Sequence, residues 1–125
     1  MKKKQHQFEI WAKRILDKYE NILLLGDHDV VFKRHEISGD AYMEHAFHYP
    51  YKTTEIRYDE RALKDFEDKK NHEFLRKVLV HELCHSITDP LYNTAYDRFT
   101  SKEVLENERE RLTDHIANII LRLKI

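Results

Sequence analysis

The chain has 125 residues, and its 22 Lys or Arg against 23 Asp or Glu give a formal net charge of -1. A chain of this length suits one domain with a modest core, so we expect residues 1–125 to form a single domain. The balanced charge provides no broad basic field of the kind that drives nucleic-acid binding. We therefore expect no nucleic-acid partner.

The sequence gives no sign of a disulfide, a membrane span or a secretory leader. A single cysteine, Cys84, excludes a disulfide within the chain. No apolar run approaches the ~20 residues that cross a bilayer. The basic start at residues 1–4 is followed by polar residues, where a signal peptide needs an apolar region. A cytoplasmic protein without membrane contact is expected.

Residues 5–21 carry large apolar side chains at spacings of three and four, with charged residues between them. This pattern predicts an amphipathic helix that faces the core with Phe8, Trp11, Ile15 and Tyr19. A stripe of aromatic side chains could also bind a partner, but in a small domain such a stripe is more often core.

The pattern changes to short strands between residues 30 and 59. Turn signals stand at residues 38–40 and at Pro50, and β-branched or aromatic residues lie between them. Three strands are predicted, the first from Val30 to Phe32 and the others over 41–49 and 53–58, in a small, largely antiparallel sheet. In a regular strand His45 and His48 point to opposite faces, so they cannot chelate one ion together, and surface or partly buried positions are expected.

Helices return after the predicted sheet. Asp59 can cap a short helix over residues 60–70, and Asn71 can cap the next helix, which is expected to end at Pro90. Residues 91–99 lack helical periodicity and are expected to form a loop.

The last helix is predicted from a capping box, Thr100-x-x-Glu103, and from an apolar pattern that follows it. The apolar side chains recur at intervals of three, four and seven, which predicts a buried stripe toward the C-terminus: Leu105, Leu112, Ile116, Ile119 and Leu123. The predicted fold class is therefore α+β.

Residues 81–85 read His-Glu-Leu-Cys-His, the pattern in which a helix presents two imidazoles and a carboxylate to one zinc ion. At about 100° per residue, His81 and His85 stand one turn apart on the same side of a helix, and Glu82 lies beside them. Apolar side chains that pack into a core are expected on the opposite side: Leu79, Val80, Leu83 and Ile87. A surface helix with two solvated histidines is the alternative, which the surrounding apolar residues disfavour.

A catalytic zinc site usually has three protein ligands, so a third donor must come from elsewhere in the chain. The candidates precede the apolar run of the last helix: Glu103, Glu106, Glu108 and Glu110. Glu110 stands one turn before Asp114, so Glu110 could bind zinc while Asp114 accepts the second N–H of a ligating histidine. Glu108 has no acid at that spacing.

These two motifs resemble those of the gluzincin metallopeptidases, and the size and layout are closest to the compact ImmA/IrrE-like proteins common in phages and mobile elements. The resemblance covers roughly residues 54–120. It implies a minimal zincin-like domain with zinc bound by His81, His85 and Glu110 and with Glu82 as general base. Residues 111–113 depart from the small residues often seen there, which leaves Glu108 possible.

Such a site would hydrolyse peptide bonds. Zinc lowers the pKa of its bound water to about 7, and Glu82 could accept a proton and return it to the leaving amine. Candidates for a donor to the oxyanion are Tyr92, Tyr96 and His115. If strand 53–58 edges the cleft, an extended chain could add to it through main-chain hydrogen bonds, so a peptide or protein substrate is expected.

Two alternatives remain open. Deformylase-like chemistry uses the same two histidines with an upstream cysteine ligand, whereas Cys84 lies inside the motif about 100° from His85 and is better interpreted as a packing residue. The other alternative is a non-catalytic zinc-binding module that keeps the metallopeptidase fold for regulation or partner recognition.

Overall fold

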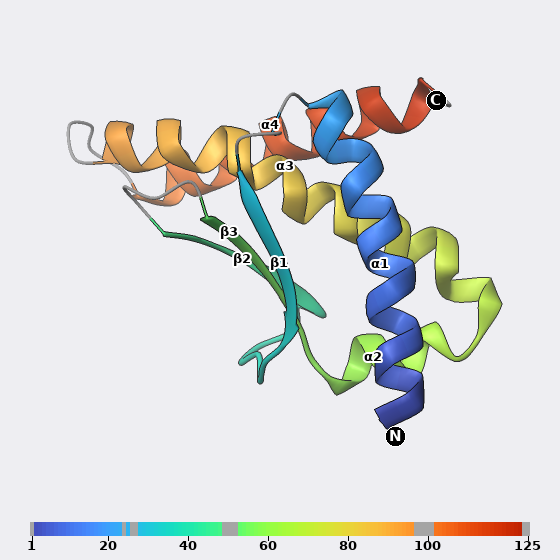
Figure 1. The fold of residues 1–125 in the computed structure, drawn as a ribbon. Coiled ribbons are helices and arrows are strands. Elements are labelled where there is room, and N and C mark those ends of the chain that lie inside the picture. The colour runs from blue at the N-terminus through green and yellow to red at the C-terminus, as the bar shows by residue number, and fades with distance from the viewer. Residues whose placement is uncertain (1, 24, 26–27, 49–52, 97–101, 124–125) are drawn as a thin grey trace.

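The computed structural model describes residues 2–23, 25, 28–48, 53–96 and 102–123, except for the side chains at positions 2, 47–48, 90–91 and 93–96. The elements in chain order are α1 (Lys2–Ile22), β1 (Asp29–Arg34), β2 (Met43–His48), β3 (Thr53–Tyr58), α2 (Glu60–Phe66), a 3₁₀ turn η1 (Lys69–Asn71), α3 (His72–Tyr96) and α4 (Lys102–Arg122). The predicted α+β class, with a helix, a small sheet, the motif helix and a last helix rich in glutamate, is confirmed (Figure 1). No helix in the described ranges is long and apolar enough to cross a membrane.

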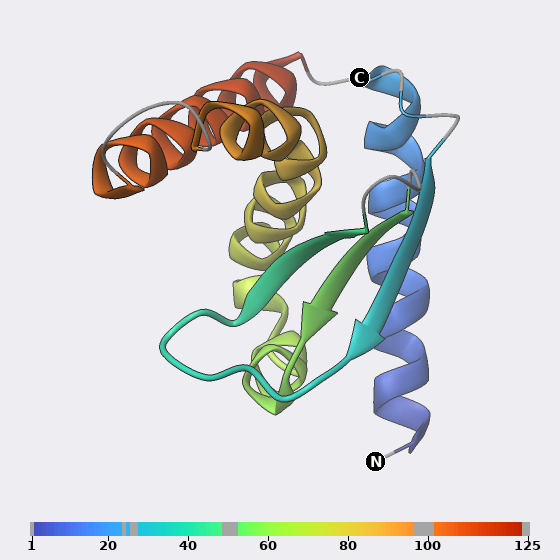
Figure 2. The same cartoon turned by 90° about the vertical axis from the view of Figure 1, so that its left-hand side faces the viewer.

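β3 is the central strand of the sheet. It pairs in parallel with β1 and antiparallel with β2, and Ile56 lies between Phe32 of β1 and His45 of β2. The sheet is therefore mixed, and strand 53–58 lies at its centre, so the condition under which an extended chain could add to this strand is not met. The edge strand nearest α3 is β2 (Figure 2). Strand propensity could not reveal this order, because a crossover connection leaves no local pattern in the sequence.

The core lies between the sheet and the helices α1 and α3, which cover one of its faces (Figure 2). Phe8 is fully buried, and its ring centroid lies 4.9 Å from those of Tyr58 and Phe66. Tyr19 is also buried, so the stripe predicted over residues 5–21 faces the core as expected. Burying a side chain of the size of Phe contributes roughly 1.5–3 kcal/mol, so these rings hold α1 firmly to the sheet.

The caps of the short helices differ partly from the prediction. Asp59 caps α2 as expected, because its Oδ1 accepts a hydrogen bond from the Arg61 N–H at 2.9 Å. Asn71 does not cap α3; it ends η1, and its side-chain Nδ2 donates to the Asp65 carbonyl at 3.2 Å. The capping carboxylate in this stretch belongs to Asp68, which stands before η1. Both Asx residues match the same pattern, and only the tertiary structure shows which one serves as a cap.

α3 does not end at Pro90 but continues to Tyr96. The loop predicted over residues 91–99 is therefore helical as far as residue 96, and residues 97–99 lie outside the described part. A proline lacks one backbone donor and tends to bend a helix rather than always ending it. α3 changes direction between its yellow and orange parts in Figure 2.

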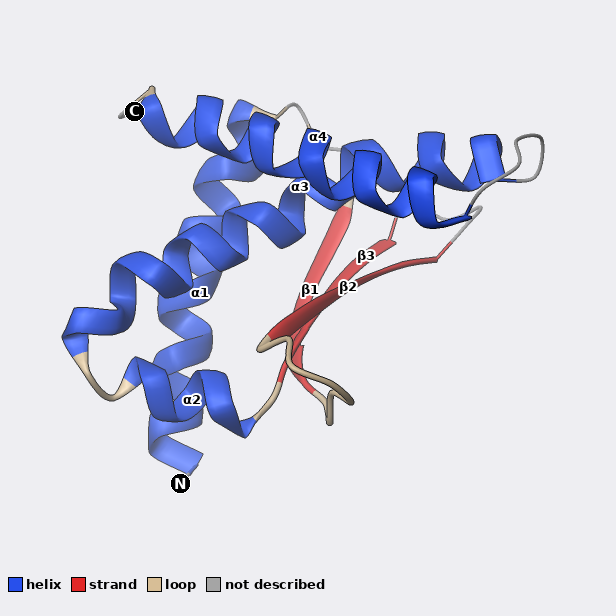
Figure 3. Cartoon of the chain, turned by 180° about the vertical axis from the view of Figure 1, so that it is seen from behind, coloured by secondary structure: helices blue, strands red, loops and turns tan. Residues whose placement is uncertain are grey.

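α4 packs along α3 with a face that coincides only in part with the predicted stripe, of which Leu105 and Ile116 are partly buried. Its buried residues are Thr113, Ala117 and Ile120. By contrast, Leu112, Ile119 and Leu123 are 39%, 49% and 52% exposed, respectively. The predicted cap Thr100 lies outside the described residues. Figure 3 shows α4 lying alongside α3 on one side of the molecule.

Candidate metal centre

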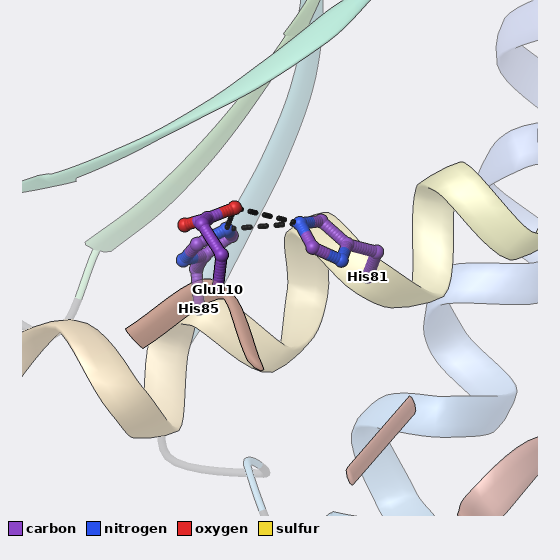
Figure 4. Close-up of side chains that lie close together, drawn as sticks. All are labelled: His81, His85 and Glu110. Atoms are coloured by element: carbon purple, nitrogen blue, oxygen red, sulfur yellow. Dashed lines mark hydrogen bonds and ion pairs between the residues drawn. The ribbon is translucent and has the colours of Figure 1, made fainter. Parts of the chain in front are cut away.

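His81 and His85 of α3 meet Glu110 of α4 at one point (Figure 4). The Nε2 atoms of the two histidines lie 3.2 Å apart. Glu110 Oε1 lies 3.2 Å from Nε2 of His81 and 3.4 Å from Nε2 of His85. Together these three atoms form a group that could hold a metal ion.

The spacing of the three atoms fits a tetrahedral zinc site. Zinc binds imidazole nitrogen at about 2.0–2.1 Å and carboxylate oxygen at about 2.0–2.2 Å, so two ligand atoms at tetrahedral angles lie roughly 3.3–3.5 Å apart. The separations of 3.2 to 3.4 Å differ little from this value. Three protein donors would leave the fourth tetrahedral position free.

The two helices are joined close to this group by a pair of threonines. The hydroxyls of Thr88 on α3 and Thr113 on α4 lie 2.8 Å apart, and both residues are buried. Thr113 Oγ1 donates to the Arg109 carbonyl at 2.7 Å, so the remaining proton on this pair is donated by Thr88. Small side chains at the crossing let the helix backbones approach closely, and this approach brings Glu110 within reach of the histidines.

Each of the three side chains is oriented by a further charged group. His81 Nδ1 donates to Asp114 Oδ1 at 2.6 Å, which is the contact predicted from the spacing of Glu110 and Asp114. His85 Nδ1 donates to Asp89 Oδ1 at 2.9 Å. Carboxylates that bind the second nitrogen of a ligating histidine fix its ring and tautomer and leave Nε2 for the metal.

Glu110 is held in the same way by its neighbour Arg109. The guanidinium Nε donates to Glu110 Oε2 at 3.1 Å, which leaves Oε1 facing the histidines. The guanidinium carbon of Arg109 also lies 4.2 Å from the ring centroid of Tyr92. An arginine so fixed restricts the rotation of the Glu110 carboxylate.

His45 of β2 extends the group into the sheet. The residue is partly buried, as expected, and its side chain is only 2% exposed. Nδ1 of His45 donates to Asp89 Oδ2 at 3.0 Å, and its ring stacks on His85 with centroids 5.7 Å apart. Its Nε2 lies 3.4 Å from Ser86 Oγ. The side chain of His48 lies outside the described part.

Neither Asp89 nor His45 is among the residues that the sequence predicts for the site. Asp89 stands one helical turn after His85, at the same spacing that identified Asp114 from Glu110. The spacing of one helical turn therefore predicts a contact between His85 and Asp89. No sequence pattern indicates His45, because its contact joins a strand to a helix 44 residues later.

Glu82 lies beside the triad in a buried position. It is 7% exposed, and its Oε1 lies 3.9 Å from Nε2 of His85. Burial raises the pKa of this carboxyl to about 7. A carboxyl with this pKa can both accept and release a proton near neutral pH.

The other charges of the group stabilise one another. Burial alone would lower the pKa of His85, but hydrogen bonds to Asp89 and Glu110 outweigh burial and raise it to about 9. Hydrogen bonds from His81 and His85 hold the pKa of Glu110 well below its usual range. Without a cation the histidines thus supply the positive charge that the carboxylates require, and a bound metal would replace the proton on His85.

The other candidate residues lie elsewhere or make other contacts. Glu108 is paired with Arg111 at 2.8 Å on the surface, so Glu110 and not Glu108 faces the histidines. The Tyr92 hydroxyl donates to Glu106 at 3.4 Å, and His115 is exposed. The side chain of Tyr96 lies outside the described part.

Of the apolar residues expected behind the motif, Leu79, Val80 and Leu83 are fully buried, but Ile87 is 41% exposed. Cys84 is buried among them, and burial raises the pKa of its thiol to about 12. A thiol in this state is a packing group, as the sequence predicts.

The chain matches no protein-family model, no curated protein and no solved structure.

Proposed function

We propose that the protein is a zinc-dependent peptidase, with zinc held by His81, His85 and Glu110. The observation that carries this proposal is the convergence of the three donors next to Glu82, a buried carboxyl that is not part of the donor set. A catalytic zinc site typically has three protein donors, such as two imidazoles and one carboxylate, and its fourth position stays open. A purely structural site would normally have four protein ligands.

When bound, zinc supplies a water of lowered pKa and a Lewis acid for a carbonyl oxygen. The chain itself must move the protons. Glu82 accepts a proton from the attacking water and later donates it to the leaving amine. Burial, which raises the pKa of Glu82 to about 7 in the metal-free protein, favours the uptake of this proton.

The edge strand β2 supports a peptide as substrate. β2 pairs only with β3 among the described strands, so its other side can pair with an extended chain. His45 ties β2 to Asp89 of α3, and this contact fixes the strand next to the triad. A peptide bound along β2 would therefore pass beside Glu82.

The proposed ligands are tested by measuring zinc in the purified protein and in two glutamate variants. We expect about one zinc per chain in the wild type and a large loss in Glu110→Ala. Glu108→Ala is the matched control, because Glu108 lies on the same helix but pairs with Arg111. Equal zinc content in the two variants would remove Glu110 from the site.

The proposed reaction is tested with Glu82→Gln. Zinc content should be unchanged, because the donor set remains, while cleavage of a peptide library should fall by the ~10²–10⁴ typical of a lost general base. Equal cleavage by both proteins would disprove this role for Glu82. A wild type that binds zinc but cleaves no peptide would instead favour the second function considered, a zinc-binding module for regulation or partner recognition.

A further inference from the structure

We propose that α4 is a dimerisation surface, through which two copies of this chain associate with their α4 helices antiparallel. The proposal does not depend on the peptidase function. Part of the apolar stripe that the sequence predicts to be buried lies at the surface, because Leu112, Ile119 and Leu123 are between 39% and 52% exposed. α4 runs along the outside of the molecule (Figure 3). Apolar side chains gathered on one exposed face mark an interaction site, whereas single ones do not.

The stripe has the spacing of a coiled-coil seam. Its side chains follow one another at intervals of seven, four, three and four residues: Leu105, Leu112, Ile116, Ile119 and Leu123. This alternation averages 3.5 residues, which keeps the side chains in line when two helices wind around each other. The side of α4 that packs on α3 is a different one, with Thr113 and Ala117 buried. The helix can therefore contact α3 with one side and a second copy with another.

The charges beside the stripe favour a second copy in the antiparallel orientation. Glu108, His115 and Arg122 recur every seven residues along one flank of the stripe, and all three are exposed. A two-fold axis near Asp114 brings Glu108 close to Arg122 of the second copy, and symmetry makes this contact twice. A parallel pair would instead place Arg109 opposite the same residue of the second copy, and like charges repel.

The same axis matches the apolar side chains of the two copies. It places Leu112 opposite Ile116 and Leu105 opposite Leu123 of the second copy. Leu105 and Leu112 line a groove of about 210 Å³ between α4 and α3, together with Tyr92. Leu123 of the second copy would enter this groove as a knob enters a hole in a coiled coil. One end of the stripe thus provides the groove and the other end fills it.

The contacts of Glu108 within one chain leave room for this arrangement. Glu108 pairs with Arg111 at 2.8 Å, and the two side chains are 59% and 73% exposed. An exposed pair one turn apart contributes little to stability. A carboxylate has four sites for hydrogen bonds, so Glu108 can accept from Arg111 and from Arg122 of the second copy together.

The proposed interface lies away from the metal centre. Glu110 precedes Leu112 by two residues, so at about 100° per residue their side chains stand about 200° apart around α4. A dimer formed through the stripe leaves the His81 and His85 side of α4 uncovered. Substitutions in the stripe should therefore change dimerisation and leave the zinc content and the Tm of the chain as in the wild type.

Sedimentation equilibrium of the full chain tests the association. The interface is one helix of 21 residues, which is about 30 Å long, so we expect a Kd in the micromolar range. Ile119→Arg brings a charge opposite Arg109 of the second copy and should raise this Kd at least about a hundredfold. Val104→Arg is the matched control, because Val104 is 58% exposed on α4 outside the stripe, and its Kd should change less than about threefold.

Two outcomes of this experiment would overturn the proposal. A wild type that stays monomeric up to about 500 µM would show that a second copy does not bind the stripe, which would then be left to a different protein partner. An equal rise of Kd in Ile119→Arg and Val104→Arg would show that the stripe is not the interface.

A charge exchange tests the antiparallel orientation at two exposed positions. Glu108→Arg and Arg122→Glu should each weaken dimerisation about three- to tenfold, and the double variant should recover to within about twofold of the wild type. In a parallel dimer the two positions would lie about 21 Å apart along the helix axes, so no recovery would follow. A double variant as weak as the single ones would overturn the antiparallel dimer.

Discussion

Asp89 accepts hydrogen bonds from two imidazoles, His85 on its own helix and His45 on the edge strand. These bonds outweigh burial, which alone would raise the pKa of Asp89, and hold this pKa well below its usual range. A carboxylate that stays charged in a buried position orients the donor ring more strongly than one exposed to water. Asp114 provides the comparison, because its side chain is 65% exposed and that of Asp89 is 15% exposed.

We therefore predict that Asp89→Asn lowers zinc affinity by about 10–100-fold, the usual cost of losing an orienting partner of a metal-bound histidine. Asp114→Asn should have a smaller effect, because water can replace an exposed carboxylate. Competition with a chelator of known affinity measures both values. An equal loss of zinc affinity in the two variants would show that burial of the carboxylate does not affect how strongly it orients the histidine.

His45 should influence the site only through Asp89 and through packing. His45→Phe keeps a ring in the buried space but removes the hydrogen bond to Asp89. The hydrogen bond from His85 to Asp89 remains, so we expect zinc affinity to fall less than in Asp89→Asn. The visible spectrum of the cobalt-loaded protein should shift, because the His85 ring is less restrained. An unchanged spectrum would mean that His45 does not position the site.

At the scale of the elements, the crossing of α3 and α4 decides whether Glu110 reaches the histidines. Thr113 is fully buried at this crossing, whereas its neighbour Leu112 is 39% exposed. A larger side chain at position 113 would force the helices apart. We predict that Thr113→Leu destabilises the fold by about 1–3 kcal/mol and weakens zinc binding.

Leu112→Ala is the control for this variant and should change the free energy of unfolding by about 0.5 kcal/mol or less, as for other surface positions. Urea unfolding and a zinc competition assay measure the two effects. A larger loss of stability in Leu112→Ala than in Thr113→Leu would mean that α4 packs with the face that the apolar pattern predicts.

The same crossing shows what the sequence could and could not predict. The pair of histidines in the motif and the pairing of Glu110 with Asp114 are suggested by helical spacing, because contacts one turn apart depend only on the repeat of 3.6 residues. The choice between Glu110 and Glu108 stays open in the sequence and is made by the tertiary structure. The buried face of α4 does not follow, because small polar residues such as Thr113 make the closest contacts between helices yet add nothing to an apolar pattern. The strand order and the contact of His45 with Asp89 depend on tertiary structure and leave no local pattern.

At the scale of the whole molecule, the proposed zinc ion would link two helices that are joined in sequence through residues 97–101. A ligand that binds only the folded state stabilises it by about 2.7 kcal/mol at a free concentration one hundred times Kd. Removal of zinc by a chelator should therefore lower Tm by several degrees. The control is Glu110→Ala, in which the chelator should have little effect. An unchanged Tm in the wild type would mean that the site is empty or does not contribute to stability.

The pH dependence of this effect follows from His85, whose pKa in the metal-free protein is raised to about 9. A histidine with a raised pKa stabilises the fold fully below its unfolded pKa of about 6.5, and this contribution is lost as the pH rises through about 9. Glu110 and Asp89 have lowered pKa values, so their contribution is present above about pH 4 and is lost only in acid.

The metal-free protein should therefore lose stability between about pH 6.5 and 9. Zinc binds deprotonated imidazoles, so its affinity should increase over the same range. The difference in Tm between zinc-loaded and metal-free protein should widen as the pH rises, and thermal melts at several pH values measure it. In His85→Ala the metal-free protein should show a flatter profile, while His115→Ala, which changes an exposed histidine on α4, should behave as the wild type. A metal-free wild type with constant Tm across this range would contradict the pairing of a protonated His85 with Asp89 and Glu110.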